Sequence, residues 1–249
     1  MKSHPFELLK AFHFASAVAE FVEEVFTPSF TALLFSSLLC TLLIGIRMSL
    51  HDSIAFGFLL WNLFLAWVPF LLSRYISFKK RYDDKLAWQL LPVWLICLPN
   101  APYLITDFVH LSWKSPTYWL DILIIFSCAA VGLALFIASL LKIHDILLKT
   151  LGRISSRIIV AAILPATALG IFLGRFLRWN SWDLLTNPAM IINDLGRIFN
   201  GKFTAEMLSF TGAFTIFLTT VYVIARKLHQ HFEHNPAFKT FSLTFSKEA

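Results

Sequence analysis

The segment Leu98-Pro99-Asn100-Ala101-Pro102-Tyr103-Leu104-Ile105-Thr106-Asp107-Phe108-Val109-His110 decides how this chain is organised. It begins inside an apolar run long enough to cross a membrane, and its prolines interrupt the helix there. Proline has no amide hydrogen to donate, and it disfavours the α conformation in the residue before it. We therefore predict an irregular link at residues 99–102 and a new helix from Pro102, with Asn100 or Ala101 as its N-cap.

On this new helix, four polar side chains are spaced by four, three and four residues, which places them on one face. They are Tyr103, Asp107, His110 and Lys114. A polar stripe beside a broken membrane helix is a typical place for binding or chemistry in membrane proteins. The sequence thus predicts a functional site next to the break.

The composition is that of an integral membrane protein. Of the 249 residues, 57% are hydrophobic and only 14% are charged, whereas soluble domains carry about 25% charged residues. The net charge of +6 comes from basic residues spread over short loops, which favours membrane topology over nucleic-acid binding. The three cysteines lie in apolar runs, so we expect buried thiols without a disulfide or a metal. The N-terminus carries acids and indicates no cleavable signal peptide.

We predict an all-α fold, a polytopic transmembrane bundle of six spans whose third span is broken at the Pro-Asn-Ala-Pro segment. Each span is close to the roughly 20 residues that cross the hydrocarbon core. They are expected at residues 30–47, 54–73, 86–106, 118–141, 157–177 and 208–225. Residues 1–29 are predicted to form an amphipathic helix on the membrane surface, residues 30–225 the membrane domain, and residues 226–249 a cytoplasmic tail.

The distribution of lysine and arginine predicts the orientation. One side of the predicted bundle carries 15 of these residues and the other side carries 6. Because cytoplasmic loops are enriched in basic residues, both termini are expected on the cytoplasmic side. The membrane is expected to be a plasma or inner membrane. The loops that follow His110 and Arg178 then face outward.

Asp107 and His110 are the candidate catalytic residues. A carboxylate and an imidazole three residues apart on a helix can share a proton or a metal. The alternative is structural: both side chains would satisfy nearby backbone groups and an arginine at the membrane boundary. The two readings are equally compatible with the sequence.

A second polar block follows the fifth span, and it suits the binding of a phosphate or carboxylate head group. Gly170 and Gly174 allow close helix contact, and arginines with tryptophans at this depth suit an anion. The alternative is ordinary anchoring by snorkelling arginines and an aromatic belt. The candidate binding residues, including two from the broken segment, are Asn100, Tyr103, Arg175, Arg178, Asn180, Trp182 and Asp183.

Charges at the membrane boundary are costly unless they are paired or wet. We therefore predict that Asp107 or His110 lies within direct or one-water reach of Arg175, Arg178 or Asp183, around an outward-facing pocket. Other outer residues are candidates for its wall or for partners of an arginine. These are His51, Asp52 and Asp121. No metal site is assigned, because the histidines at 229, 231 and 234 fit a solvated tail better than a ligand set. No cofactor is identified.

Three stretches resemble a bacterial family of polytopic membrane proteins, the domain of unknown function numbered 1361. They are Trp61-Asn62-Leu63-Phe64-Leu65-Ala66-Trp67, Leu98-Pro99-Asn100-Ala101-Pro102-Tyr103-Leu104-Ile105-Thr106-Asp107 and Gly174-Arg175-Phe176-Leu177-Arg178-Trp179-Asn180-Ser181-Trp182-Asp183. The resemblance runs over about residues 55–225. It implies a multi-span bacterial membrane protein and brings no established activity.

The residues leave three functions open, and they do not decide whether the protein is an enzyme. The first is binding or processing of an amphiphilic or anionic lipid-linked substrate at the outer face. The second is a transporter or permease component, because a discontinuous helix is a known device for anion sites. The third is a non-catalytic membrane assembly partner. Few ionisable residues lie deep in the spans, which favours the interfacial site over proton-coupled transport.

Overall fold

The described part of the chain consists of helices joined by short loops. This structure is a computed structural model, and it describes residues 16–51, 54–179, 186 and 203–234. No strand occurs among them, which confirms the all-α class. Residues 16–25 form a short helix. The elements after it are α2 (Pro28–His51), α3 (Gly57–Tyr82), α4 (Asp84–Cys97), α5 (Asn100–Tyr103), the 3₁₀ helix η1 (Leu104–His110), α6 (Tyr118–Phe176) and α9 (Phe203–His234).

Five helical runs are long and apolar enough to cross a membrane, one fewer than the six predicted spans. They are Pro28–Leu50, Gly57–Tyr82, Asp84–His110, Tyr118–Phe176 and Thr204–His231. The difference arises in α6, whose 59 residues contain both the fourth and the fifth predicted span. Its backbone leaves helical geometry at Gly152, with φ 79° and ψ 178°. Only glycine adopts this conformation without strain.

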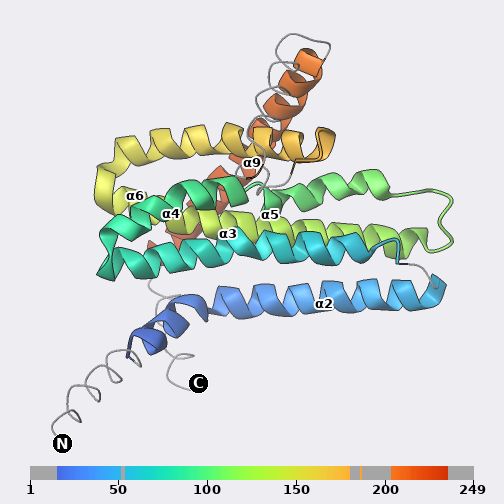
Figure 1. Cartoon of the computed structure of the whole chain (residues 1–249), viewed down its shortest axis with the longest axis horizontal. Helices are drawn as coiled ribbons and strands as arrows, with labels where there is room; N and C mark the ends of the chain where they lie inside the picture. Colours follow the sequence, from blue (N-terminus) through green and yellow to red (C-terminus); the bar gives the residue numbers. More distant parts are fainter. Residues whose placement is uncertain (1–15, 52–53, 180–185, 187–202, 235–249) are drawn as a thin grey trace, which may run out of the picture.

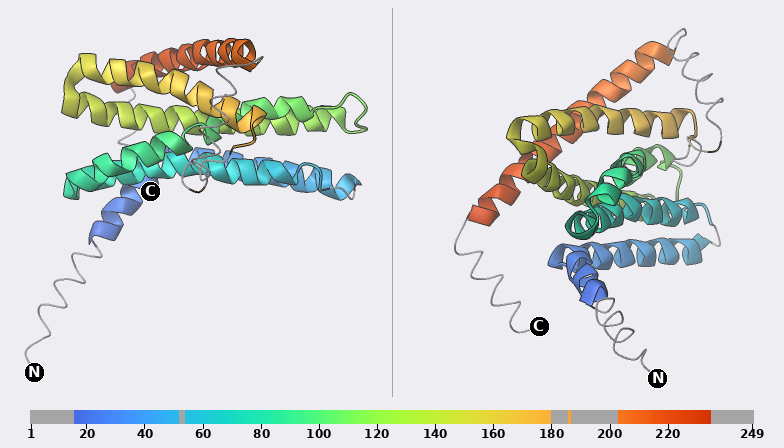
Figure 2. Two further views of the ribbon diagram at one scale, coloured as in Figure 1. Left: turned by 45° about the horizontal axis from the view of Figure 1, so that its top comes forward. Right: turned by 60° about the vertical axis from the view of Figure 1, so that its left-hand side comes forward.

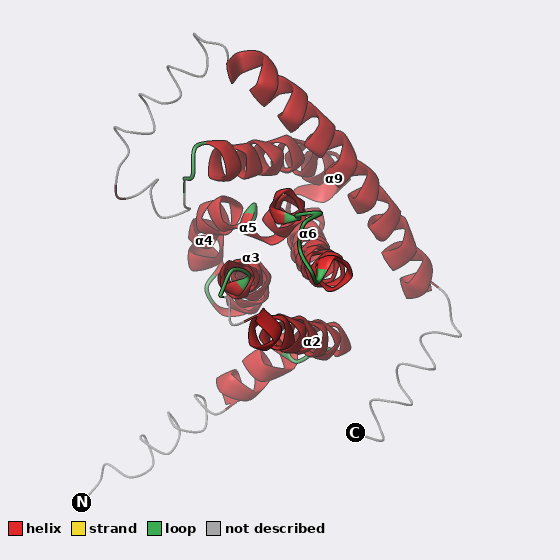
Figure 3. Ribbon diagram, turned by 90° about the vertical axis from the view of Figure 1, so that its right-hand side faces the viewer, coloured by secondary structure: helices red, strands yellow, loops and turns green. Residues whose placement is uncertain are grey.

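At Gly152 the helix α6 turns back on itself, so that it has two arms (Figure 1). We call residues 118–151 the first arm and residues 153–176 the second arm. In both views of Figure 2 the two arms lie along each other, and α9 crosses them. Figure 3 shows α2, α3, α4 and α6 grouped around one core, with α9 on the outside.

The third apolar run is broken where the sequence predicts it. Helix α4 ends at Cys97 and α5 begins at Asn100. The predicted start at Pro102 is wrong by two residues, because Pro99 itself takes helical angles (φ −58°, ψ −26°) and serves as the N-cap. Pro102 is tolerated inside the first turn, where amide groups have no helical acceptor.

The predicted polar stripe does not form one α-helical face. Residues Leu104–His110 are a 3₁₀ helix, in which side chains three apart are aligned. Leu104 and Asp107 are buried, His110 at the end of the same row is exposed, and Lys114 lies beyond the helix. The tighter winding therefore turns Asp107 toward the core.

Glycines on both arms of α6 allow the broken segment to lie between them. A Cβ atom on Gly132 of the first arm would overlap the carbonyl oxygen of Ala101, and one on Gly170 of the second arm would overlap the ring of Pro99. A Cβ on Gly174 would lie 3.3 Å from the Tyr103 ring. The predicted close approach at Gly170 and Gly174 is thus confirmed, and its partner is the break.

Buried hydrogen bonds link α3, α4 and the first arm next to this segment. The indole nitrogen of Trp94 donates to Ser139 Oγ at 2.8 Å, and that hydroxyl donates to the carbonyl oxygen of Pro69 at 2.8 Å. Both side chains are buried. Because an unpaired polar group in an apolar interior is costly, these bonds stabilise one register of three helices.

The short helix at residues 16–25 packs on the C-terminal part of α3 and on the first arm of α6, at the end of the bundle opposite the break. The carboxylate of Glu24 is buried and pairs with Arg81 at 2.8 Å and with Lys142. The ring of Phe21 contacts those of Tyr75 and Phe78 edge-on, with centroids 5.9 and 5.3 Å apart. Glu24 belongs to the polar face of the predicted amphipathic helix, so this face turns partly toward the bundle. The first 15 residues of the predicted surface helix lie outside the described residues.

Candidate functional site

Asp107 and Arg175 form a buried ion pair between η1 and the end of the second arm. Arg175 Nη1 lies 3.3 Å from Asp107 Oδ1, and the carboxylate is 0% exposed. The other carboxylate oxygen accepts a hydrogen bond from Asn62 Nδ2 at 3.0 Å. The predicted contact between the broken segment and the arginine block is therefore confirmed. Asn62 on α3, which was not among the predicted site residues, supplies the third member.

The guanidinium of Arg175 is engaged on several sides by η1 and α5. Its Nη2 donates to the carbonyl oxygen of Thr106 at 2.6 Å, and its Nη1 donates to the Tyr103 hydroxyl at 3.3 Å. The group also lies over the Tyr103 ring, 5.6 Å from the centroid. The planar guanidinium group suits this combination of bidentate bonding and ring contact. Arg175 thus fastens the irregular segment to α6.

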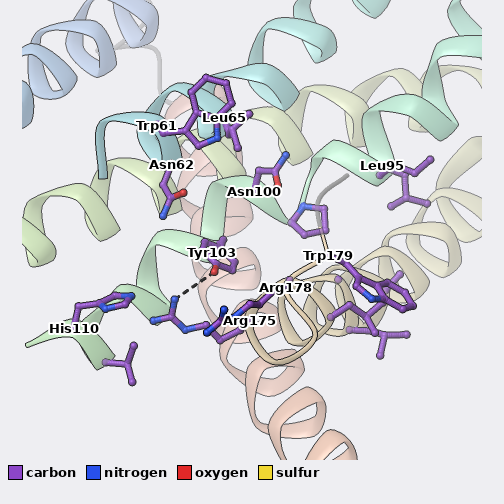
Figure 4. Close-up of a pocket in the computed structure, with 18 residues that line it drawn as sticks. Trp61, Asn62, Leu65, Leu95, Asn100, Tyr103, His110, Arg175, Arg178 and Trp179 are labelled. Atoms are coloured by element: carbon purple, nitrogen blue, oxygen red, sulfur yellow. Dashed lines mark hydrogen bonds between the residues drawn. The ribbon is translucent and has the colours of Figure 1, made fainter. Parts of the chain in front are cut away.

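A cavity of about 730 Å³ lies beside this ion pair, between α3, the broken helix and the second arm. One end is polar, with Asn62, Asn100, Tyr103, His110, Arg175 and Arg178. The other end is apolar, with Leu95, Ile96, Ala166 and Leu169 among its lining residues. Figure 4 shows the arginines and Tyr103 at one part of this cavity and Leu95 at another. Its volume is in the range of small-molecule sites.

Arg178, just after the end of α6, has backbone dihedral angles that are unfavourable for a residue other than glycine. It is the one described residue other than glycine with a positive φ, at 57°. The carbonyl oxygen of Leu173 accepts the amides of both Leu177 (3.1 Å) and Trp179 (3.4 Å), which stabilises this turn. The side chain is exposed, lines the cavity, and has no ion pair or hydrogen bond within the described part of the chain. Strained backbone of this kind is found preferentially at functional sites.

The predicted site residues separate into three groups. Asn100, Tyr103, His110, Arg175 and Arg178 line the cavity. Asp107 does not line the cavity. One of its carboxylate oxygens accepts a hydrogen bond from Asn62 and the other accepts one from Arg175. Asn180, Trp182 and Asp183 lie outside the described residues, as does Asp52.

His110 differs from its predicted partner Asp107 in its surroundings. Its ring is exposed at the cavity and lies 4.7 Å from the ring centroid of Phe58. The two side chains therefore share a row of η1 and have opposite environments. His110 is exposed at the cavity, whereas Asp107 is buried and contacts Arg175, which lines the cavity.

Asp121 forms a second ion pair away from the cavity. Its Oδ1 lies 3.0 Å from Arg47 Nε, its Oδ2 accepts from Ser115 Oγ at 2.6 Å, and Arg47 lies 4.3 Å from the ring centroid of Phe56. The prediction that Asp121 pairs with an arginine is confirmed. The prediction that it completes the pocket wall is wrong, because Arg47 and Ser115 occupy its carboxylate on another side of the bundle.

Within the described ranges, no group of three or more histidine, cysteine, aspartate or glutamate side chains is arranged to hold a metal ion. The chemistry that the cavity offers is therefore carried by arginine, imidazole, amide and phenol groups. These groups recognise anions and polar head groups.

The chain belongs to the family described as a protein of unknown function (DUF1361), whose model matches residues 61–221. This confirms the resemblance found in the three sequence stretches. No curated protein and no solved structure matches the chain. The matched region contains most of α3, the broken helix, both arms of α6 and more than half of α9.

Proposed function

We propose that the cavity binds an amphiphilic, lipid-linked anion, with the charged head at Arg178 and the apolar part at the opposite end. One observation carries this proposal: an exposed arginine without a partner in the described chain lies on a strained backbone at the polar end of a cavity that is apolar elsewhere. The strain costs about 1–2 kcal/mol for a residue other than glycine. A side chain kept there at that cost is a candidate for binding.

The charges that line the cavity favour an anion. Arg175 is neutralised by Asp107, whereas Arg178 has no carboxylate partner in the described ranges. A carboxylate or phosphate oxygen at Arg178 would form a charge-assisted hydrogen bond, which is among the strong ones in proteins. Binding is better supported than acid–base chemistry through Asp107, because that carboxylate does not reach the cavity.

We also propose that the chain crosses a bacterial inner membrane six times. Both termini would lie on the cytoplasmic side, and the cavity would lie near the outer face. A single helix of 59 residues would be about 88 Å long at 1.5 Å per residue, far more than a bilayer of about 30 Å. Because α6 turns back at Gly152, each of its two arms can cross the bilayer separately. The turn then lies at the same end as the basic link between α3 and α4 (Figure 1), as expected from the 15-to-6 distribution of basic residues.

The experiment is a binding measurement with dihexanoyl phosphatidylglycerol, an anionic amphiphile, on protein in phosphatidylcholine nanodiscs. Trp61 and Trp179 line the cavity, so intrinsic fluorescence reports on the site. Arg178→Ala and Arg178→Gly should each weaken binding about tenfold or more, because a hydrogen bond to a charged group contributes about 1.5–3 kcal/mol. Arg178→Gly should also raise the melting temperature by a few degrees, because glycine adopts the positive φ freely.

The matched control is Lys114→Ala, which removes an exposed charge outside the cavity on the same side of the bundle. It should leave binding unchanged. Equal affinity of the wild type and both Arg178 variants, or equal affinity for dihexanoyl phosphatidylcholine, would contradict the proposal.

The broken helix favours transport as a second candidate function. Discontinuous helices line the substrate sites of several transporters. Flux of the anionic amphiphile across proteoliposomes, lost in Arg178→Ala, would support transport. Binding without flux would support a receptor or enzyme.

A further inference from the structure

We infer that the ligand is a phosphodiester lipid of the outer leaflet that carries a single negative charge, and that its acyl chain reaches the cavity sideways from the bilayer. This inference rests on the proposed function, because it names the ligand class of the same cavity. It follows from the position of the apolar end, its depth, and the number of unpaired charges at the polar end.

The apolar end of the cavity is built from side chains that also face the outside of the bundle. Ala166 on the second arm is exposed, and Leu95 on α4 and Leu169 on the second arm are half-buried. At the rim, 54% of Trp61 is exposed. Outward-facing apolar side chains on membrane helices are in contact with lipid chains. An acyl chain can therefore reach the cavity between α4 and the second arm without crossing water.

The depth of the apolar end corresponds to one leaflet. Ala166 precedes Arg175 by nine residues on the same arm, which is about 13 Å at 1.5 Å per residue. Half of the hydrocarbon core is about 15 Å. A lipid with its head at the arginines would thus bring the middle of its chain to Ala166 and Leu169, and it would remain in one leaflet.

The polar end matches a head with one negative charge. Arg175 and Asp107 neutralise each other at 3.3 Å, so Arg178 is the single permanent charge without a carboxylate partner among the described lining residues. A phosphodiester carries one negative charge and is matched by one arginine. A phosphomonoester carries about 1.5 to 2 negative charges near neutral pH, and part of this charge would lack a partner. The polar end therefore favours phosphatidylglycerol-like heads over phosphatidic acid.

The test uses phosphatidylglycerol with a diazirine at the middle of one acyl chain, at low fraction in phosphatidylcholine nanodiscs that contain the full chain. Illumination should place adducts on residues 93–97 and 164–170. Leu169→Trp, which fills the apolar end, should lower these adducts at least fivefold. Leu208→Trp is the matched control, because Leu208 is exposed on α9 and does not line the cavity; it should leave them unchanged. Unlabelled phosphatidylglycerol should compete at least fivefold better than phosphatidic acid.

A probe without chains separates this inference from the proposed function. Glycerophosphoglycerol carries the same phosphodiester and should bind the wild type and Leu169→Trp equally, and Arg178→Ala at least tenfold more weakly. If this probe or the short-chain lipid binds through Arg178 while the diazirine labels no cavity residue, lateral access is wrong and the proposed function stands. If no anion binds in an Arg178-dependent way, both are wrong. Stronger competition by phosphatidic acid would overturn the single-charge assignment.

Discussion

At the scale of single residues, the surroundings of Asp107 differ from those expected of a group that acts directly on a ligand. Its spacing from His110 fits acid–base chemistry, yet its carboxylate is fully buried and bonded to Asn62 and Arg175. A buried ion pair contributes little net stability, but removal of one partner leaves a buried charge without compensation. We therefore propose that Asp107 positions Arg175.

We predict that Asp107→Asn destabilises the protein by about 3 kcal/mol, the lower part of the range for a broken buried pair. Arg175 retains its bond to the Thr106 carbonyl, which limits the loss. Thermal unfolding in detergent, followed by tryptophan fluorescence, should show a melting temperature lower by several degrees. Below that temperature, the affinity for dihexanoyl phosphatidylglycerol should not fall, because Arg178 is unchanged and Arg175 at the cavity loses its neutralising carboxylate.

Asp84→Asn is the control for this measurement, because Asp84 is exposed and forms an i,i+4 surface pair with Lys80. Such pairs contribute less than about 1 kcal/mol. An unchanged melting temperature in Asp107→Asn, together with lost ligand turnover or binding, would instead identify Asp107 as a group that acts on the ligand.

At the scale of elements, the broken helix and the two arms of α6 depend on each other. After the break the chain continues as the 3₁₀ helix η1, and the glycines at 132, 170 and 174 make room for the broken segment. The cavity lies where this segment meets the second arm. The packing of one irregular element therefore determines the geometry of the site.

We predict that Gly132→Ala lowers the free energy of unfolding by about 1–3 kcal/mol, the cost of overpacking a tight contact. The added methyl group would overlap the backbone carbonyl of Ala101, which cannot rotate away as a side chain can. Ligand affinity should fall as well, because the displaced segment carries Asn100 and Tyr103. Thermal unfolding and fluorescence titration measure the two effects.

Gly45→Ala is the matched control, since Gly45 is a helical glycine of α2 with nothing within 4 Å of an added Cβ. It should raise stability by up to about 1 kcal/mol through helix propensity. A stabilised Gly132→Ala with normal binding would show that the segment between the arms is not tightly constrained.

At the scale of the whole molecule, charge is distributed so that the two ends of the bundle differ. The end that contains the α3–α4 link and the Gly152 turn has buried and paired charges from the short N-terminal helix, including Glu24 with Arg81 and Lys142. The opposite end contains the two ion pairs of Asp107 and Asp121 and the cavity. The proposed orientation rests on the unequal number of basic residues at these two ends, 15 against 6.

Cysteine labelling of intact cells with a membrane-impermeant maleimide tests the orientation and the six crossings. In a variant without Cys40, Cys97 and Cys128, Trp113→Cys should be labelled, because Trp113 is 83% exposed in the predicted outer loop. Lys80→Cys and Ile154→Cys should react only after lysis. Labelling of Ile154→Cys but not of Lys80→Cys in intact cells would show that α6 does not turn back in the membrane.

The sequence by itself determined the class of the protein, the break in the third run and the residue types at the site, because hydropathy, proline chemistry and basic-residue bias are local properties. It also indicated the contact between the broken segment and the arginine block. Only the tertiary structure decided which of the predicted site residues reach the cavity and that Asp107 does not. The 3₁₀ winding of η1 turns Asp107 inward, Gly132 and Gly170 give the broken segment room between the arms, and Arg178 is exposed just after α6 ends. These outcomes depend on packing between residues distant in the chain, which spacing along one helix does not contain.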